Sequence, residues 1–310
     1  MQEKRNRNRF ILLLVLTVVT VIVFWWIQPE NRLDIDPDIF QVDDLNSISK
    51  VELVSDTAVV TLAFDGGHWR VNDSYQADRS MIRVLFATLQ QARPMRAVAM
   101  LQKDSILRHL EESGVKVSLF EGQQLIKHFY VGGNLGKTQS FFADPGSGDV
   151  YLMTIPGYRV YVSGILEVGE NGWRDKFVFG FRWENFKSLD AKFGKNPSEN
   201  FTVSMSRQFF GIEGLPKTDT ARLNTFLDDV SLLAVDEYIY KPGLSDSLRA
   251  IKPQLEITVT DIGNRIYRLR LYDHGPAGYV FGLIQDTEVA IFERKKIQPL
   301  LKPKSVFREK

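Results

Sequence analysis

The sequence predicts an α+β protein in which an N-terminal transmembrane helix precedes two similar antiparallel-sheet units with helices packed on one face. Three observations predict this class. An uncharged apolar run lies near the start of the chain, alternating apolar and polar residues follow from Ile48 onward, and the order of the expected elements repeats. Alternation with a period of two is typical of strands that bury one face, and helices on that face would complete the core.

The first expected element is a membrane anchor at residues 10–27, eighteen residues without a charge. A helix that rises ~1.5 Å per residue would span about 27 Å, close to the thickness of a bilayer core. The positive-inside rule keeps the basic tail, residues 1–9, in the cytoplasm, and indole side chains favour the opposite interface. The residues assigned to the anchor are Phe10, Leu14, Val18, Val21, Trp25 and Trp26, and those assigned to topology are Lys4, Arg5, Arg7 and Arg9.

A cleaved signal peptide is the alternative to this anchor. The apolar run exceeds the ~7–15 residues usual in such peptides, and residues 28–32 offer no site with two small residues. A buried core helix fits less well, because the run has no polar face. We therefore expect an uncleaved single-pass anchor with the bulk of the chain on the outer side of the membrane.

The first repeat is expected at residues 48–167, after an acidic linker at residues 28–47 that contains two prolines and should be extended and solvated. A turn at Asp65-Gly66-Gly67 joins two of its strands, because glycine supplies the positive φ of a tight turn. Asp78 should cap a helix that runs to about Ala92. The other expected elements are strands near 48–54, 58–64, 68–71, 115–120, 125–131, 139–143 and 150–154, and short helices at 104–112 and 158–166.

The second repeat is expected at residues 186–301, after a connecting segment at 168–185. Its expected elements are strands at 186–193, 200–205, 209–212, 255–260, 266–272, 278–283 and 288–292, a helix from Asp219 to Val230, and a final helix at 294–301. The offset is 139 both from Ile48 to Lys187 and from Lys116 to Leu255. The alternative is one α+β domain whose hairpins look alike by chance. Residues 302–310 form a basic C-terminal tail, either solvated or in contact with anionic lipid or an acidic partner.

Composition and motifs exclude several functions. The net charge of +1 provides no field that would favour nucleic acid, and a chain without cysteine has no disulfide, thiolate metal site or cysteine nucleophile. The segment Gly132–Thr138 looks like a phosphate loop but lacks the first glycine and precedes a strand, so we interpret it as a hairpin loop. No G-x-S-x-G motif occurs. Metal-ligand spacing is absent around the four histidines, His68, His109, His128 and His274. We therefore expect no catalytic residue, cofactor or metal.

One aromatic segment is a candidate partner surface. Four aromatic residues alternate at Phe177, Phe179, Phe181 and Trp183, which would place them on one face of an extended segment. Such a face either packs in the core between the two halves or forms an exposed strip that docks a partner.

Several motifs of the chain together resemble a known family. They are Ile48–Leu53, Gly67–Val71, Tyr75–Asp78, Val131–Phe142 and Trp173–Lys176. In this order they resemble a bacterial family of unknown function, single-span envelope proteins with a duplicated α+β unit. Members often occur beside ABC-type transporters of the gliding-motility auxiliary class. The resemblance covers roughly residues 48 to 240 and carries no catalytic residues with it.

The resemblance implies a bacterial inner-membrane protein with its N-terminus in the cytoplasm and its bulk in the periplasm. We expect a non-enzymatic accessory or scaffold protein of an envelope complex, with a transporter as the associated partner. Its partners would be membrane lipid and an envelope protein, without nucleic acid. The alternative is a periplasmic binding protein for a lipid, glycan or peptide in the cleft between the two repeats. An enzyme with a site assembled from scattered residues is the third hypothesis.

Overall fold

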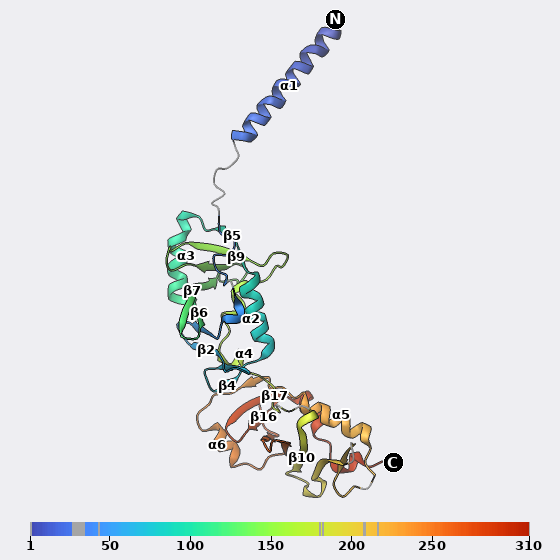
Figure 1. Ribbon diagram of the computed structural model, residues 1–310. Helices are drawn as coiled ribbons and strands as arrows, with labels where there is room; N and C mark the ends of the chain where they lie inside the picture. The colour runs from blue at the N-terminus through green and yellow to red at the C-terminus, as the bar shows by residue number, and fades with distance from the viewer. Residues whose placement is uncertain are drawn as a thin grey trace. The chain divides into compact units, whose positions relative to one another are not determined.

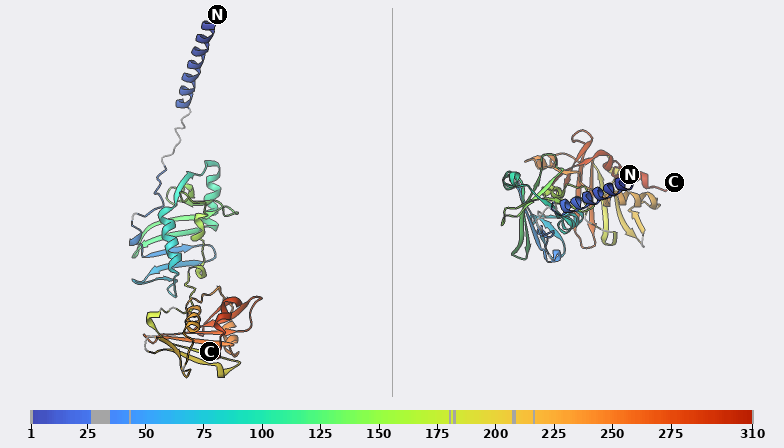
Figure 2. Two further views of the ribbon diagram at one scale, coloured as in Figure 1. Left: turned by 90° about the vertical axis from the view of Figure 1, so that its right-hand side faces the viewer. Right: turned by 90° about the horizontal axis from the view of Figure 1, so that it is seen from above.

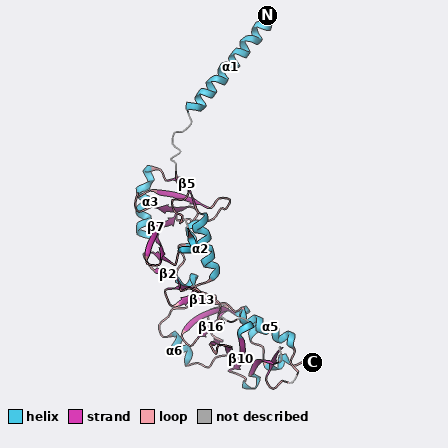
Figure 3. Cartoon of the chain, viewed as in Figure 1, coloured by secondary structure: helices cyan, strands magenta, loops and turns pink. Residues whose placement is uncertain are grey.

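The computed structural model describes residues 2–26, 35–42, 44–179, 181, 183–206, 209–215 and 217–309, and the side chains of these residues except 2–9, 24–26, 183 and 206. The chain divides into a first unit, residues 1–67 and 80–168, and a second unit, residues 68–79 and 169–310. Each unit contains a large antiparallel sheet with helices, so the α+β class is confirmed (Figure 1). Strands dominate both units (Figure 3), and their sheets are visible from two further directions in Figure 2.

The N-terminal helix α1 spans Gln2–Trp26. Its apolar side chains from Phe10 to Val23 are exposed, among them the anchor residues Phe10, Leu14, Val18 and Val21. The hydroxyl groups of Thr17 and Thr20 donate hydrogen bonds to backbone oxygens one turn earlier, at 2.9 and 2.8 Å. Within the part of the chain that the structure describes, no helix has the length and apolarity that a membrane crossing requires. The side chains of Lys4, Arg5, Arg7, Arg9, Trp25 and Trp26 lie outside the described residues.

In the first unit, antiparallel strands follow the order β2-β1-β6-β7-β8-β9-β5. They are β1 (Lys50–Val54), β2 (Val59–Phe64), β5 (Arg93–Ala97), β6 (Val115–Glu121), β7 (Gln124–Gly133), β8 (Ser140–Ala143) and β9 (Val150–Thr154). The helices are α2 (Arg79–Gln91), α3 (Met100–Ser113) and the 3-10 turns η1 (Leu45–Ser47) and η2 (Val162–Ile165). The expected alternation is present, because Val51 and Leu53 of β1 are buried. The glycine-rich segment forms the β7–β8 hairpin, as expected.

Two expectations for the first unit differ from the structure. The segment that begins at Arg93 forms β5, where the sequence predicted no strand. It contains Pro94, and β5 is the last strand of the sheet order, where proline is tolerated. The helix expected at residues 158–166 is only the short turn η2.

The acidic linker is not wholly solvated. Phe40 is 5% exposed, and its ring lies 5.4 Å from the rings of Phe129 and Phe142 in edge-on geometry. The ammonium of Lys127 donates to the backbone oxygens of Ile39 and Gln41, at 2.8 and 2.6 Å. The linker therefore contributes an aromatic residue to the core of the first unit, while residues 28–34 and 43 lie outside the described residues.

In the second unit, strands follow the order β12-β11-β10-β14-β15-β16-β17-β13. They are β10 (Phe186–Phe193), β11 (Phe201–Ser206), β12 (Phe209–Ile212), β13 (Glu237–Tyr238), β14 (Leu255–Asp261), β15 (Ile266–Tyr272), β16 (Tyr279–Ile284) and β17 (Glu288–Glu293), with the paired strands β3 (Trp69–Val71) and β4 (Tyr75–Gln76) in the same unit. The helices are α4 (Glu170–Trp173), α5 (Thr220–Ser231), α6 (Leu244–Arg249) and α7 (Arg294–Ile297), with 3-10 turns η3 (Trp183–Asn185), η4 (Pro197–Glu199), η5 (Gln298–Leu300) and η6 (Lys304–Phe307).

The two sheets share one topology. The succession β2-β1-β6-β7-β8-β9-β5 of the first unit has the same pattern as β11-β10-β14-β15-β16-β17-β13 of the second. In the first unit, β5 follows helix α2 and lies at the far edge of the sheet, beyond β9. In the second unit, β13 follows helix α5 and lies at the far edge, beyond β17. A shared topology of this kind is what the predicted internal repeat requires.

Helices cover both faces of the second sheet. Leu271 packs in the cluster that contains the buried side of α5, whereas the next residue, Tyr272, packs with Leu248 of α6. Successive side chains of a strand point to opposite faces, so α5 and α6 lie on opposite sides of the sheet. The expectation of helices on one face is therefore wrong for this unit.

The basic C-terminal tail is part of the second unit. Phe307 is fully buried, and its ring lies 5.3 Å from that of Phe201 and 5.4 Å from that of Phe226. The ammonium of Lys302 pairs with Asp229 at 3.5 Å. The expectation of a solvated tail overlooked this single aromatic residue within a basic segment.

Candidate functional site

A cavity of about 900 Å³ lies in the second unit. It is bordered by β4, by the segment after α4, by the chain that follows β13 and by the start of β17. Its walls include Tyr75, Arg174, Tyr238, Tyr240, Lys241 and Glu288. A cavity of this size, with aromatic walls and a few charged groups, is typical of ligand or partner binding sites.

Arg174 forms the buried centre of this site and is 3% exposed. Its guanidinium carbon lies 3.5 Å from the ring centroid of Tyr75 and 3.7 Å from that of Tyr238. One terminal nitrogen donates to the hydroxyl oxygen of Tyr240 at 2.7 Å, and the other donates to a carboxylate oxygen of Glu288. The cation is thus stacked on two aromatic rings and neutralised by one carboxylate.

Backbone contacts fix the position of Arg174. The residue forms a bridge with Ala77, and the preceding Trp173 is fully buried. The backbone N–H of Asp78 donates to the oxygen of Trp173, and the N–H of Asp175 donates to the oxygen of Gln76, both at 2.8 Å. The motifs Tyr75–Asp78 and Trp173–Lys176, about a hundred residues apart in sequence, therefore lie side by side as a short two-stranded clasp.

A second layer of polar groups surrounds the hydroxyl of Tyr240. This hydroxyl donates to a carboxylate oxygen of Glu170 at 3.4 Å, and the side-chain amide of Asn72 donates to the other oxygen at 2.6 Å. Because Tyr240 accepts from Arg174 and donates to Glu170, it links the buried cation to a second carboxylate. Such connected networks hold their members in one geometry.

Burial favours the neutral forms of two tyrosines of the site, Tyr238 and Tyr240. It raises the pKa of Tyr238 to about 12, against a smaller lowering effect of Arg174. Burial and a hydrogen bond with Tyr75 also raise the pKa of Tyr240. At neutral pH these two hydroxyls are hydrogen-bonding groups and not bases.

Two residues of the candidate aromatic strip are buried. Phe179 and Phe181 are 1% and 7% exposed and lie in the core of the second unit, whereas Phe177 is 51% exposed. The described residues 177–179 and 181 form no strand, and Val178 is buried between Phe177 and Phe179, so burial does not alternate there. The docking interpretation is therefore wrong for Phe179 and Phe181, which pack in the core of the second unit. The side chain of Trp183 lies outside the described residues.

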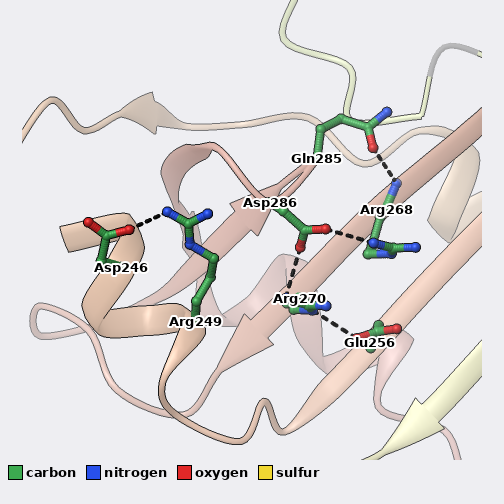
Figure 4. A network of polar contacts seen from close by, with 7 residues as sticks. All are labelled: Asp246, Arg249, Glu256, Arg268, Arg270, Gln285 and Asp286. Carbon is green, nitrogen blue, oxygen red and sulfur yellow. Dashed lines mark hydrogen bonds and ion pairs between the residues drawn. The ribbon is translucent and has the colours of Figure 1, made fainter. Parts of the chain in front are cut away.

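Charged groups also gather on the sheet of the second unit (Figure 4). Asp286 pairs with Arg268 at 2.6 Å and with Arg270 at 2.9 Å, and Arg270 pairs with Glu256 at 2.8 Å. These side chains are partly exposed and neutralise one another, so they attract an external charge only weakly. Among the described residues, no group of three or more acidic or histidine side chains could hold a metal ion.

The sequence analysis used Tyr75 and the Trp173–Lys176 motif only for the family resemblance and did not single out Tyr238, Tyr240 or Glu288. A usable signal was present in Tyr238-Ile239-Tyr240, where two tyrosines separated by one residue share one face of an extended segment. Nothing local links them to Arg174, because the contact joins distant parts of the chain.

The fold and the site define an α+β protein with two antiparallel sheets and an arginine–tyrosine pocket in its second unit. Residues 69–257, more than half of the chain, match the model of a domain of unknown function (DUF4340), and the chain belongs to this family. The expectation of a family without an assigned function is confirmed. No curated protein and no solved structure matches the chain.

Proposed function

We propose that this chain is a non-enzymatic accessory protein of a bacterial envelope complex, anchored in the inner membrane, with its two units in the periplasm. The burial, stacking and pairing of the Arg174 guanidinium are the observation that carries this proposal. A buried cation whose faces are stacked and whose terminal nitrogens are paired holds the walls of the 900 Å³ pocket in one geometry, and a rigid pocket suits recognition of a partner. Catalysis would require a base or nucleophile within reach of a substrate, whereas the carboxylate of Glu288 is engaged by Arg174 and the raised pKa values of Tyr238 and Tyr240 favour their neutral forms.

The anchor is supported by the exposed apolar side chains of Phe10–Val23 and by the internally bonded hydroxyls of Thr17 and Thr20. An apolar surface of this extent is stable only when lipid or protein covers it. The described apolar stretch is shorter than a bilayer requires, so the proposal relies on the sequence remaining apolar to Ile27. The basic residues that precede the stretch would hold the N-terminus in the cytoplasm.

The proposed partner is an integral membrane protein, and the family resemblance favours an ABC-type transporter. An internal duplication is part of the proposal, and the shared strand order of the two sheets supports it. Two similar units on one anchor offer several edges and pockets to a membrane-bound assembly.

Purification of the tagged full-length protein in mild detergent tests this function. We expect a stoichiometric membrane protein to remain bound and to be identified by mass spectrometry. Exchange of residues 1–27 for an unrelated transmembrane helix should reduce its recovery, because the native anchor contributes contacts in the membrane. Recovery of the full-length chain alone and without ligand would contradict the proposal, as would complete extraction of the chain from membranes by alkaline carbonate.

A ligand-binding role is the second candidate, and the 900 Å³ cavity with its exposed Lys241 favours it. The ligand would be a lipid, glycan or peptide that reaches the tyrosine walls. Mass spectrometry of the same preparation should then detect a small molecule, and Lys241→Glu should reduce its occupancy. Lys295→Glu is the control, since Lys295 is exposed elsewhere in the unit. Equal occupancy in both variants would exclude this pocket.

A further inference from the structure

A four-residue pattern occurs twice in the chain. Trp173-Arg174-Asp175-Lys176 and Phe307-Arg308-Glu309-Lys310 each read aromatic residue, arginine, acid, lysine. The first lies in the predicted connecting segment and the second in the predicted basic tail. The two segments therefore correspond in sequence, although they were assigned different roles.

The two patterns also occupy the same backbone position. Arg174 bridges Ala77, and Arg308 bridges Thr218. Ala77 and Thr218 each stand two residues before the first residue of a main helix, α2 or α5. The structure thus contains two clasps, which we call the Arg174 clasp (Gln76–Asp78 with Trp173–Asp175) and the Arg308 clasp (Lys217–Asp219 with Phe307–Glu309).

Hydrogen bonds repeat this equivalence. The N–H of Asp78 donates to the oxygen of Trp173, and the N–H of Asp219 donates to the oxygen of Phe307, both at 2.8 Å. The N–H groups of the acids after each arginine also donate across the clasp, at 2.8 Å for Asp175 and 3.2 Å for Glu309. Trp173 and Phe307 are both fully buried.

The two arginines differ in what covers them. Arg174 is buried beneath Tyr238 of the edge strand β13, beside Tyr240 and Glu288. Arg308 is exposed, and within the described ranges no side chain pairs with its guanidinium. Lys217 next to it is exposed as well. The Arg308 clasp adjoins the end of β12, where the N–H of Ile212 faces the hydroxyl of Thr218 at 3.5 Å, and β12 is the last strand of the sheet order.

We propose that the Arg308 clasp is a docking site for a partner protein that supplies what β13 supplies to Arg174. That occupant is an edge strand with two tyrosines separated by one residue and a nearby carboxylate. The positive charge of the exposed Arg308 and Lys217 favours an acidic complement in the occupant. The inference rests on the proposed role as an accessory protein and names the surface that the partner occupies.

A second copy of this chain does not meet these requirements. Its β13 is already engaged with Arg174. The strand with the corresponding place in the first unit is β5, and it carries Arg93 and Arg96 instead of tyrosines and acids. Like charges at the contact would oppose association.

The test uses a fluorescent peptide with the sequence of residues 236–242, Asp-Glu-Tyr-Ile-Tyr-Lys-Pro, and the full-length protein in detergent. Fluorescence anisotropy should detect binding to the native chain. Arg308→Glu should weaken it by roughly tenfold or more, because that factor corresponds to the loss of one stacked, paired cation. A peptide with both tyrosines replaced by alanine should not bind. Arg249→Glu, an exposed arginine on α6, is the matched control and should leave binding unchanged.

Absence of binding, or equal binding by the native chain and Arg308→Glu, would overturn this inference. Because Arg308 is exposed, the variant should unfold at the same temperature as the native chain, which separates binding from folding. The partner recovered in detergent distinguishes the two proposals. A partner that stays bound to Arg308→Glu contradicts this site alone, whereas peptide binding that depends on Arg308 without any recovered partner supports the site and contradicts the accessory function.

Discussion

At the scale of single residues, Arg174 illustrates how neighbouring side chains stabilise a buried charge. A guanidinium removed from water without partners would cost several kcal/mol. Here two rings cover its faces and one carboxylate balances its charge. Glu288 keeps 30% of its side chain exposed, so this pair is weaker than one with both partners buried. The stability that Arg174 contributes therefore comes largely from stacking and packing.

Replacement of Arg174 by alanine should lower the free energy of unfolding by about 2–4 kcal/mol, because stacking, the ion pair and packing are lost together. Urea unfolding of the full-length protein in detergent, followed by tryptophan fluorescence, measures this change. Arg249→Ala removes an exposed pair with Asp246 and should cost less than about 0.5 kcal/mol. Equal costs for the two variants would contradict the structural role of Arg174.

Alkaline pH should selectively weaken the hydrogen bond from the hydroxyl of Tyr238 to the backbone oxygen of Asp175. Its pKa is raised to about 12 in the folded chain, from an ordinary value of 10.0, so the unfolded chain loses this proton first. The stabilising effect is complete below pH 10 and disappears as pH rises through about 12. The native chain should be more stable than Tyr238→Phe by about 1 kcal/mol near neutral pH, since the hydroxyl donates to the oxygen of Asp175.

Thermal unfolding of both chains between neutral pH and pH 12 tests this. The advantage of the native chain over Tyr238→Phe should shrink above pH 10. The reference is the difference in thermal stability between the native chain and Tyr158→Phe, which alters an exposed tyrosine. An advantage over Tyr238→Phe that stays constant to pH 12 would show that burial does not oppose ionisation at this site.

At the scale of elements, local sequence signals specified the helices and strands that have one buried face. In β14, residues alternate between buried and partly exposed positions without interruption. Helix α5 begins directly after Asp219, whose carboxylate accepts a hydrogen bond from the N–H of Arg222 at 3.0 Å. These signals act over a few residues, which is why they are visible in the sequence.

Asp219→Ala should lower the free energy of unfolding by about 1 kcal/mol, because an N–H at the start of α5 loses its acceptor. Asp219→Asn keeps a side-chain oxygen and should lose only a part of this amount, chiefly through the ion pair with Arg222. Chemical denaturation of the three proteins gives the comparison. An asparagine variant as unstable as the alanine variant would mean that the charge, and not the cap, is what matters.

At the scale of the whole molecule, short peripheral segments complete the cores of the two units. Phe40 of the linker closes an aromatic cluster in the first unit, and Phe307 of the C-terminal tail does so in the second. Both segments have charged compositions that suggest solvated chain. One buried phenylalanine in each is enough to attach the segment.

Phe307→Ala should destabilise the protein by about 3–4 kcal/mol, because it removes a fully buried ring and leaves a cavity between two other rings. Phe177→Ala, which changes a phenylalanine that is 51% exposed, should cost less than about 1 kcal/mol. Thermal unfolding distinguishes them. Similar losses for both variants would mean that the C-terminal tail is not part of the core.

The sequence by itself determined the α+β class, most strand positions, the cap at Asp219 and the succession of elements in two halves. These features depend on periodicity and on contacts within a few residues. Only the tertiary structure decided that Phe179 and Phe181 are core residues, that Pro94 lies in an edge strand, and that Tyr75, Arg174 and Tyr238 form one site. The reason is that burial and cation–aromatic stacking depend on which distant segments meet in the fold, and no local sequence pattern encodes which segments these are.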